Sequence, residues 1–178
     1  MRNQNLKDYK LPKDWDRGIN IFLEAIWLII FIPLISSSIP GSFWRKIILK
    51  IFGAKLGKGI RINSRLRVKM PWKLKIGNSC WIGEDVWIDN LDLFIISNNV
   101  CISQGVYFCS GNHNYKKSSF DLIHEKIIIE SDVWIGAKSI VGPGVKIDKS
   151  SVVTMGSILS KNVPKNSLFK NNKIYDLK

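Results

Sequence analysis

Cysteine and histidine are scarce in this chain of 178 residues. Its three cysteines, Cys80, Cys101 and Cys109, are an odd number and contain no Cys-x-x-Cys spacing. A disulfide framework and a cysteine-rich zinc site are therefore disfavoured, and a reducing compartment is favoured. The two histidines, His113 and His124, leave little room for a histidine-rich metal centre. We therefore expect no bound metal.

Acidic residues are absent from a long part of the chain. No Asp or Glu lies between Glu24 and Glu84, although the chain has 14 acidic residues against 27 lysines and arginines, a formal charge of +13. The cationic residues in this gap are Arg45, Lys46, Lys50, Lys55, Lys58, Arg61, Arg65, Arg67, Lys69, Lys73 and Lys75. Concentrated positive charge implies an anionic partner. Because no nucleic-acid-recognition motif is present and an apolar segment adjoins the cluster, we expect a membrane surface and no nucleic acid.

A long apolar run precedes this basic gap. It extends from Ile19 to Ile35 and is broken only by Asn20, Glu24 and Pro33. With about 17 residues it lies at the lower limit for a transmembrane helix. No small-residue cleavage site follows it, so it fits a signal peptide poorly. Three interpretations stay open: a helix lying on a membrane, a helix buried against other subunits, and a true span.

A second, amphipathic helix is expected directly afterwards. Ser42 is positioned to cap this helix and Gly53 to end it. The apolar residues that follow the helical period are Phe43, Trp44, Ile47, Ile48 and Ile51. We interpret residues 19–58 either as an attachment to an anionic membrane or as a helical cap on the fold that follows. The two interpretations are compatible.

From about residue 60 the helical period gives way to a period of six. Consecutive hexads start with the aliphatic residues Ile129, Ile135, Val141, Ile147, Val153 and Leu159. Earlier runs start at Ile76, Ile82 and Ile88, and at Ile96, Ile102 and Phe108. This period is typical of a triangular solenoid, in which three hexads form one coil. The aliphatic first residue and the small fifth residue then point into the prism. We predict an all-β parallel β-helix of about five coils with an N-terminal helical segment.

The change of period divides the chain into three segments. Residues 1–55 contain the two helices, residues 56–165 the solenoid, and residues 166–178 a C-terminal tail. The longest interruption of the hexads predicts a loop at residues 111–126.

Several segments carry a more specific signal than the hexads. They are Phe43 to Arg45, Ile51 to Gly57, Trp81 to Asn90, Asn99 to Gly105, Ser110 to Tyr115 and Asp132 to Gly144. Over roughly residues 43–165 the chain resembles the hexapeptide-repeat acyltransferases. Within them it is most similar to the colanic acid biosynthesis acetyltransferases and the galactoside, maltose and nodulation acetyltransferases. The resemblance implies a left-handed β-helix, a homotrimer with active sites between subunits, and acetyl-CoA as co-substrate.

The resemblance also implies a general base, His113, in the longest interruption of the repeat. Acetyl transfer from a thioester to a hydroxyl needs a base, and histidine titrates in the suitable range. We interpret His124 as an ordinary loop histidine. Where many relatives have an acid after the catalytic histidine, this chain has Asn114. The group that orients the His113 ring therefore stays open between a backbone carbonyl, Asp121 and Glu125.

Other positions are assigned by the same resemblance. Asn90 and Tyr115 are candidates to hold the acceptor, and an ordinary Asn turn and a loop anchor are their alternatives. The positions expected along the coenzyme A groove are Trp134, Ala137, Met155, Ser160 and Lys161. Trp134 takes the outward-facing sixth place of its hexad, so a subunit contact suits it equally well.

These observations predict an acetyl-CoA-dependent O-acetyltransferase. We expect it to act on a sugar or glycan precursor of exopolysaccharide, capsule or O-antigen type, by direct transfer. The alternatives are a non-catalytic trimeric scaffold or membrane-docking protein, and an acetyltransferase for a small acceptor such as serine. A zinc-dependent carbonic anhydrase on this fold would need three converging histidines. The expected location is the cytoplasm, either free or on the inner face of the cytoplasmic membrane.

Overall fold

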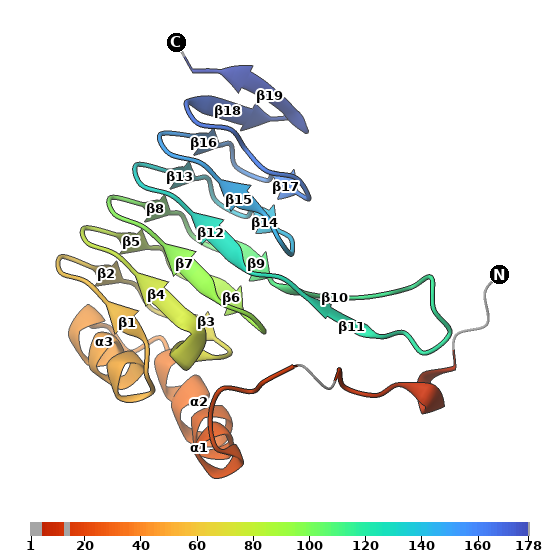
Figure 1. Cartoon of the computed structure of the whole chain (residues 1–178). Helices are drawn as coiled ribbons and strands as arrows, with labels where there is room; N and C mark the ends of the chain where they lie inside the picture. Colours follow the sequence, from red (N-terminus) through yellow and green to blue (C-terminus); the bar gives the residue numbers. More distant parts are fainter. Residues whose placement is uncertain (1–4, 13–14, 178) are drawn as a thin grey trace.

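Most of the chain winds into a three-sided prism of short parallel strands (Figure 1). The structure is a computed structural model that describes residues 5–12 and 15–177. Face A consists of β1 (Lys55–Leu56), β4 (Leu74–Ile76), β7 (Phe94–Ile96), β12 (Ile127–Ile129) and β15 (Lys146–Ile147). Face B consists of β2 (Arg61–Ile62), β5 (Trp81–Ile82), β8 (Cys101–Ile102), β13 (Trp134–Ile135), β16 (Val152–Val153) and β18 (Ser167–Lys170). Face C consists of β3 (Arg67–Val68), β6 (Trp87–Asp89), β9 (Tyr107–Cys109), β14 (Ile140–Val141) and β17 (Ile158–Leu159).

The chain visits faces A, B and C in turn, so each set of three strands is one coil. Five coils are complete, against an expectation of about five, and a sixth begins on face A with the bridge between Val163 and Ile147 and continues with β18 on face B. The segment expected only as a tail thus extends face B, where β19 (Lys173–Asp176) pairs antiparallel with β18.

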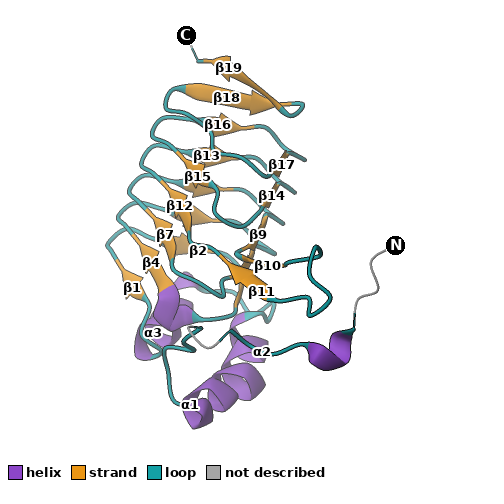
Figure 2. Ribbon diagram, turned by 45° about the vertical axis from the view of Figure 1, so that its right-hand side comes forward, coloured by secondary structure: helices purple, strands orange, loops and turns teal. Residues whose placement is uncertain are grey.

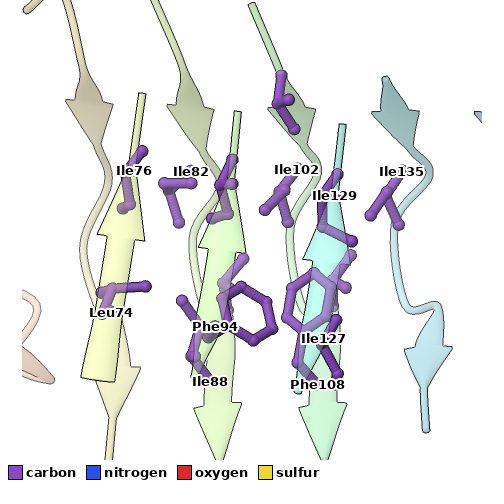
Figure 3. Packing of buried hydrophobic residues seen from close by; sticks show 14 of the residues in the cluster. Leu74, Ile76, Ile82, Ile88, Phe94, Ile102, Phe108, Ile127, Ile129 and Ile135 are labelled. Atoms are coloured by element: carbon purple, nitrogen blue, oxygen red, sulfur yellow. The ribbon is translucent and has the colours of Figure 1, made fainter. Parts of the chain in front are cut away.

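The core is built from columns of equivalent hexad residues. On face B, Ile62, Ile82, Ile102 and Ile135 are aligned by successive strand pairings and are all buried. Figure 3 shows the last three of them. The small fifth residues are buried as well: Val133, Ser139, Val145, Ser151, Ser157 and Val163. Each coil therefore covers the apolar edge of the next one, and truncating one of these isoleucines to Ala costs about 2–5 kcal/mol. The predicted roles of the first and fifth hexad places are confirmed.

Helices close the N-terminal end of the prism (Figure 2). A first helix consists of α1 (Ile21–Ile26), a π-helical turn (Trp27–Phe31) and α2 (Ile32–Ile35), and α3 (Ser42–Ile51) follows it. Trp27, Ile35, Leu49 and Phe52 are buried beneath the first coil, and the Trp27 indole N–H donates to the Val68 carbonyl at 3.1 Å. These residues shield strand edges and core that would otherwise be open at the end of a solenoid.

The structure also contains two 3-10 helices, Leu6–Asp8 and Pro71–Lys73. Within residues 5–12 and 15–177, no helix has the length and apolar character that a bilayer span requires.

Helix α3 differs from the prediction in how it begins. Gly41 is its N-cap and Ser42 its first residue, so the predicted Ser42 cap is wrong by one position. The Ser42 hydroxyl instead accepts a hydrogen bond from the Ile62 N–H at 2.9 Å. The predicted end is confirmed, because Gly53 directly follows the helix with a left-handed φ of +87°.

Candidate active site

His113 lies in a hairpin that leaves the prism between faces C and A (Figure 1). The hairpin consists of β10 (Gly111–His113) and β11 (Leu122–His124), and it replaces the loop expected at residues 111–126. The His113 Nδ1 atom lies 2.8 Å from the Phe120 carbonyl oxygen. Because a carbonyl can only accept, Nδ1 carries the proton and Nε2 keeps the lone pair that a general base needs. Of the three orienting groups left open, the structure shows the backbone carbonyl.

Two aromatic rings fix the plane of the His113 ring. Phe120 stacks on it with centroids 4.3 Å apart and 4° between the planes, and Tyr9 meets it edge-on at 5.7 Å. Phe120 has a φ of +50°, which is uncommon for a bulky residue and turns its carbonyl toward the imidazole. The Asn5 N–H also donates to the Ser118 carbonyl at 3.0 Å, so the N-terminal segment braces the hairpin. Tyr9 lies so far from His113 in the sequence that no local pattern could have predicted this contact.

His124 is held at the base of the same hairpin by a carboxylate. Its Nδ1 lies 2.8 Å from an Asp92 carboxylate oxygen. Burial alone would raise the pKa of Asp92, but hydrogen bonds from His124 and the Leu93 N–H, with the charges of His124 and Lys73, lower that pKa overall. This pair attaches the base of the hairpin to the preceding coil. His124 therefore has an ion-pair partner and a structural role.

A groove of about 500 Å³ follows the corner between faces B and C. It is lined by Ser103, Gln104, Trp134, Gly136, Ala137, Val152, Val153, Thr154 and Met155. The exposed Trp134 ring is oriented by its N–H, which donates to the Ser103 hydroxyl at 3.0 Å. Coils approach closely here, since a Cβ on Gly136 would lie 2.4 Å from the Met155 backbone nitrogen.

The structure brings together three of the five predicted cofactor positions. Trp134, Ala137 and Met155 share the groove. Ser160 and Lys161 are exposed directly after β17, at the corner between faces C and A where the His113 hairpin also leaves the prism. The groove residues Ser103, Gln104 and Thr154 were not predicted, although Ser103 and Thr154 directly follow inward-facing hexad residues.

The two predicted acceptor residues have very different environments. Asn90 is 0% exposed, its amide N–H donates to the Met70 carbonyl at 2.7 Å, and its amide oxygen accepts from the Met70 N–H at 3.0 Å. A side chain in this state has no exposed atom to offer a ligand, so Asn90 takes the turn role that was its alternative. Tyr115 is exposed on the His113 hairpin.

The described ranges contain no cluster of metal-ligating side chains, and two of the three thiols are disfavoured as nucleophiles. No group of three or more His, Cys, Asp or Glu residues there could hold a metal ion. Burial raises the pKa of the Cys80 and Cys101 thiols, which opposes the thiolate form that a cysteine nucleophile needs.

A triangular β-helix with a histidine hairpin at one corner and an open groove along another has the architecture of a hexapeptide-repeat acyltransferase. No family model matches the chain. The protein of Escherichia coli K12 named as the colanic acid biosynthesis acetyltransferase WcaF is 31% identical over 170 residues, which cover 95% of this chain and 93% of the relative. The galactoside O-acetyltransferase of the same organism is 26% identical over 125 residues, or 68% of this chain and 62% of that protein.

Solved structures share the fold. A hexapeptide-repeat acetyltransferase of Vibrio cholerae, complexed with acetyl coenzyme A, superposes with a TM-score of 0.77 and 22% identity over 90% of each chain. A galactoside acetyltransferase in complex with coenzyme A gives 0.76 and 20% identity over 97% of this chain and 89% of that one. The chain therefore belongs to the hexapeptide-repeat acetyltransferase family, and the predicted left-handed β-helix is confirmed.

Proposed function

We propose that this protein is an acetyl-CoA-dependent O-acetyltransferase for a sugar or glycan precursor of an exopolysaccharide, capsule or O-antigen. The single observation that carries the proposal is the His113 ring, whose Nδ1–H is committed to the Phe120 carbonyl while Nε2 stays free to accept a proton. The names of the colanic acid and galactoside relatives support an acetyl donor and a sugar acceptor.

In this proposal the hairpin supplies the general base and the groove holds the acetyl donor. His113 Nε2 accepts the proton of the acceptor hydroxyl as that oxygen becomes a nucleophile. The ring becomes an imidazolium, and the Phe120 carbonyl dipole stabilises its Nδ1–H without the carboxylate found in many relatives. Acetyl-CoA, when bound, supplies the acetyl group as a thioester, whose C–S bond breaks as the acceptor oxygen forms the new ester bond. The His113 imidazolium then returns the proton to the leaving coenzyme A sulfur. The groove fits its extended arm because it runs along a corner, and the small Gly136 and Ala137 leave room beside Trp134.

We propose further that the active sites lie between the subunits of a homotrimer. Within one chain, His113 is at the corner of faces C and A, whereas the groove is at the corner of faces B and C. Neighbouring subunits standing side by side bring one corner against the other, as a head-to-tail ring requires. Exposed apolar residues on the outer sides of faces B and C support such a contact: Trp81, Trp134, Ile140 and Ile158.

For its location we propose the cytoplasm, with peripheral attachment to the inner face of the cytoplasmic membrane through residues 19–58. The acid-free sequence between Glu24 and Glu84 supports an anionic partner.

Replacing the base tests the proposed activity directly. His113→Ala is expected to lower turnover of acetyl-CoA by about 10²–10⁴-fold, because general base catalysis typically contributes that much. The measurement is release of free coenzyme A in a screen of envelope sugars, nucleotide sugars, lipid-linked sugars and serine, with thermal unfolding as the check on folding.

The matched control is Lys149→Gln, which changes a charged residue at the corner between faces A and B, away from the hairpin and the groove, and is expected to keep more than a tenth of the turnover. His113→Ala retaining more than about a tenth of wild-type turnover contradicts the assignment of the base. A wild-type protein that neither binds acetyl-CoA nor turns it over supports the scaffold alternative instead.

A further inference from the structure

The helices that close the prism are apolar on two opposite sides. Their inner side carries the core residues Trp27, Ile35, Leu49 and Phe52. Their outer side exposes eleven large apolar residues: Ile21, Phe22, Leu23, Ile26, Leu28, Ile29, Ile30, Leu34, Phe43, Ile47 and Ile51. Phe22 is 76% exposed and Phe43 is 72% exposed. Capping the solenoid accounts for the buried inner residues and leaves the exposed outer ones unexplained. A helix that is apolar all round is normally buried on all sides.

We call these exposed apolar side chains of the two helices together the base surface. The C-cap residue of α3, Phe52, contacts the first helix through its ring, which lies 4.9 Å from Trp27 and 4.7 Å from Phe31 between centroids. Both helices lie below the same end of the prism (Figure 2). A soluble monomer rarely exposes a contiguous apolar patch larger than a few hundred Å², and larger ones mark interaction sites.

The base surface carries no exposed acidic group. Glu24 is the one acid of the two helices; it is buried and paired with Arg17 at 2.7 Å. The next acid in the sequence is Glu84, on the second coil.

The cations of the acid-free region differ in burial and in ion pairing. Arg45 is buried and Arg65 and Lys69 are paired with carboxylates of the next coil. Within residues 19–58, the buried Arg45 is therefore not available to a membrane surface. Lys50, Lys55 and Lys58 are exposed at the helical end, with no carboxylate partner among the residues that the structure describes.

We propose that the base surface docks on an anionic lipid bilayer, with both helices lying in its interfacial layer and the prism standing away from it. This rests on the proposed membrane location and identifies the surface that makes the contact. An apolar helical face with lysines beside it suits this layer, where apolar side chains enter and ammonium groups meet lipid phosphates. A second copy of this chain fits less well, because pairing two base surfaces would bring their lysines together without an acidic partner.

Sedimentation with vesicles tests this docking on the full-length protein. Point variants are needed, because deleting the helices would uncover Trp27, Ile35, Leu49 and Phe52. Wild type is expected to bind vesicles of phosphatidylcholine with one quarter phosphatidylglycerol, and to bind pure phosphatidylcholine more weakly. Phe22→Asp/Ile29→Asp is expected to lower the partition constant at least tenfold. Ile174→Asp/Tyr175→Asp introduces the same charge at exposed positions of β19, at the opposite end of the prism, and is expected to leave the partition constant unchanged.

A second pair of variants separates charge from apolar contact. Lys50→Gln/Lys58→Gln is expected to weaken binding about 25-fold at low salt, since each lysine near an anionic surface contributes about fivefold. The matched control, Lys170→Gln/Lys173→Gln, removes the same charge at the opposite end of the prism and is expected to have little effect.

Three outcomes would overturn the proposal: wild type that ignores anionic vesicles, controls that weaken binding as much as the base variants, or base variants that change only the oligomeric state. Coenzyme A release without vesicles is measured in parallel. An inactive protein that still binds vesicles refutes the proposed reaction alone, and an active one that does not bind refutes the docking alone.

Discussion

Arg45 is a charged residue whose role in this protein is structural. Its Nε donates to the Ile35 carbonyl at 3.0 Å, and its two terminal nitrogens donate to the carbonyls of Gly41, Ser37 and Ile39 at 2.7–2.9 Å. The planar guanidinium thereby satisfies four carbonyls of the turn between α2 and α3. Burial lowers the pKa of this group, as expected for a cation surrounded by neutral partners.

Removing this side chain is therefore expected to destabilise the helical end of the prism. Arg45→Ala leaves buried carbonyls without donors, and at about 1–3 kcal/mol for each buried unsatisfied group we expect a loss of about 3 kcal/mol or more in the free energy of unfolding. Urea denaturation at fixed protein concentration measures the change. Lys50→Ala, on the exposed side of the same helix, is the control and is expected to stay within about 0.5 kcal/mol. Equal midpoints for the two variants would contradict this role of Arg45.

At the scale of elements, the β10–β11 hairpin is stabilised at both ends. His124 and Asp92 hold its base, and the Asn5 contact to Ser118 holds its far end. The hairpin makes few contacts with the prism between these points (Figure 1). Its position, and with it the position of His113, therefore depends on these two attachments.

The Asp92 attachment predicts a pH dependence with a definite sign. A carboxyl whose pKa is lowered by folding adds stability above its ordinary pKa of 3.8 and loses that stability as the pH falls through the lowered value. Asp92→Asn is expected to speed amide hydrogen exchange in the hairpin at neutral pH, and the difference from wild type is expected to shrink toward acid. Asp85→Asn, on a distant turn, should leave these amides unaffected. A difference between Asp92→Asn and wild type that grows in acid would refute the assignment.

The elements differ in how far the sequence could predict them. The hexad columns were predictable because each inward residue recurs at a fixed local spacing. The apolar positions of α3 were also recognised, but the side of the helix that meets the core was not. The core contacts Arg45, Leu49 and Phe52, whereas Phe43 and Ile51 face outward. Which side of an apolar helix meets the protein depends on its neighbours, and periodicity alone does not contain that information.

In the candidate site, too, local sequence features were predictable and contacts between distant parts of the chain were not. His113 was predictable from a motif, whereas its contact with Tyr9 joins distant parts of the chain. Asn90 was recognised as a corner residue, but a corner amide can face either solvent or the preceding coil, and here it faces Met70. Left-handed backbone conformations favour Gly, Asn and Asp, yet Arg65 and Lys138 take φ values of +56° and +59°. Coil stacking thus outweighs local backbone preference at these turns.

At the scale of the whole molecule, the proposed sharing of active sites between subunits predicts complementation. His113→Ala lacks the base, and Ala137→Trp is designed to fill the groove beside Trp134, so each variant alone is expected to be inactive. Random mixed trimers should place an intact hairpin beside an intact groove at about one site in four, which predicts about a quarter of wild-type turnover. The measurement is coenzyme A release after co-expression, with separately purified variants mixed as folded proteins as the control. Co-expressed variants as inactive as the single ones would contradict sharing of the site.

The placement of the base surface at one end of the prism has a consequence for binding strength. Subunits that stand side by side in the proposed trimer present three such surfaces in the same direction. Once one surface touches a bilayer, the other two are confined near it at a high effective concentration. Three individually weak contacts then give strong overall avidity, so attachment would depend steeply on assembly: a free monomer would leave the membrane readily, whereas the assembled enzyme would stay.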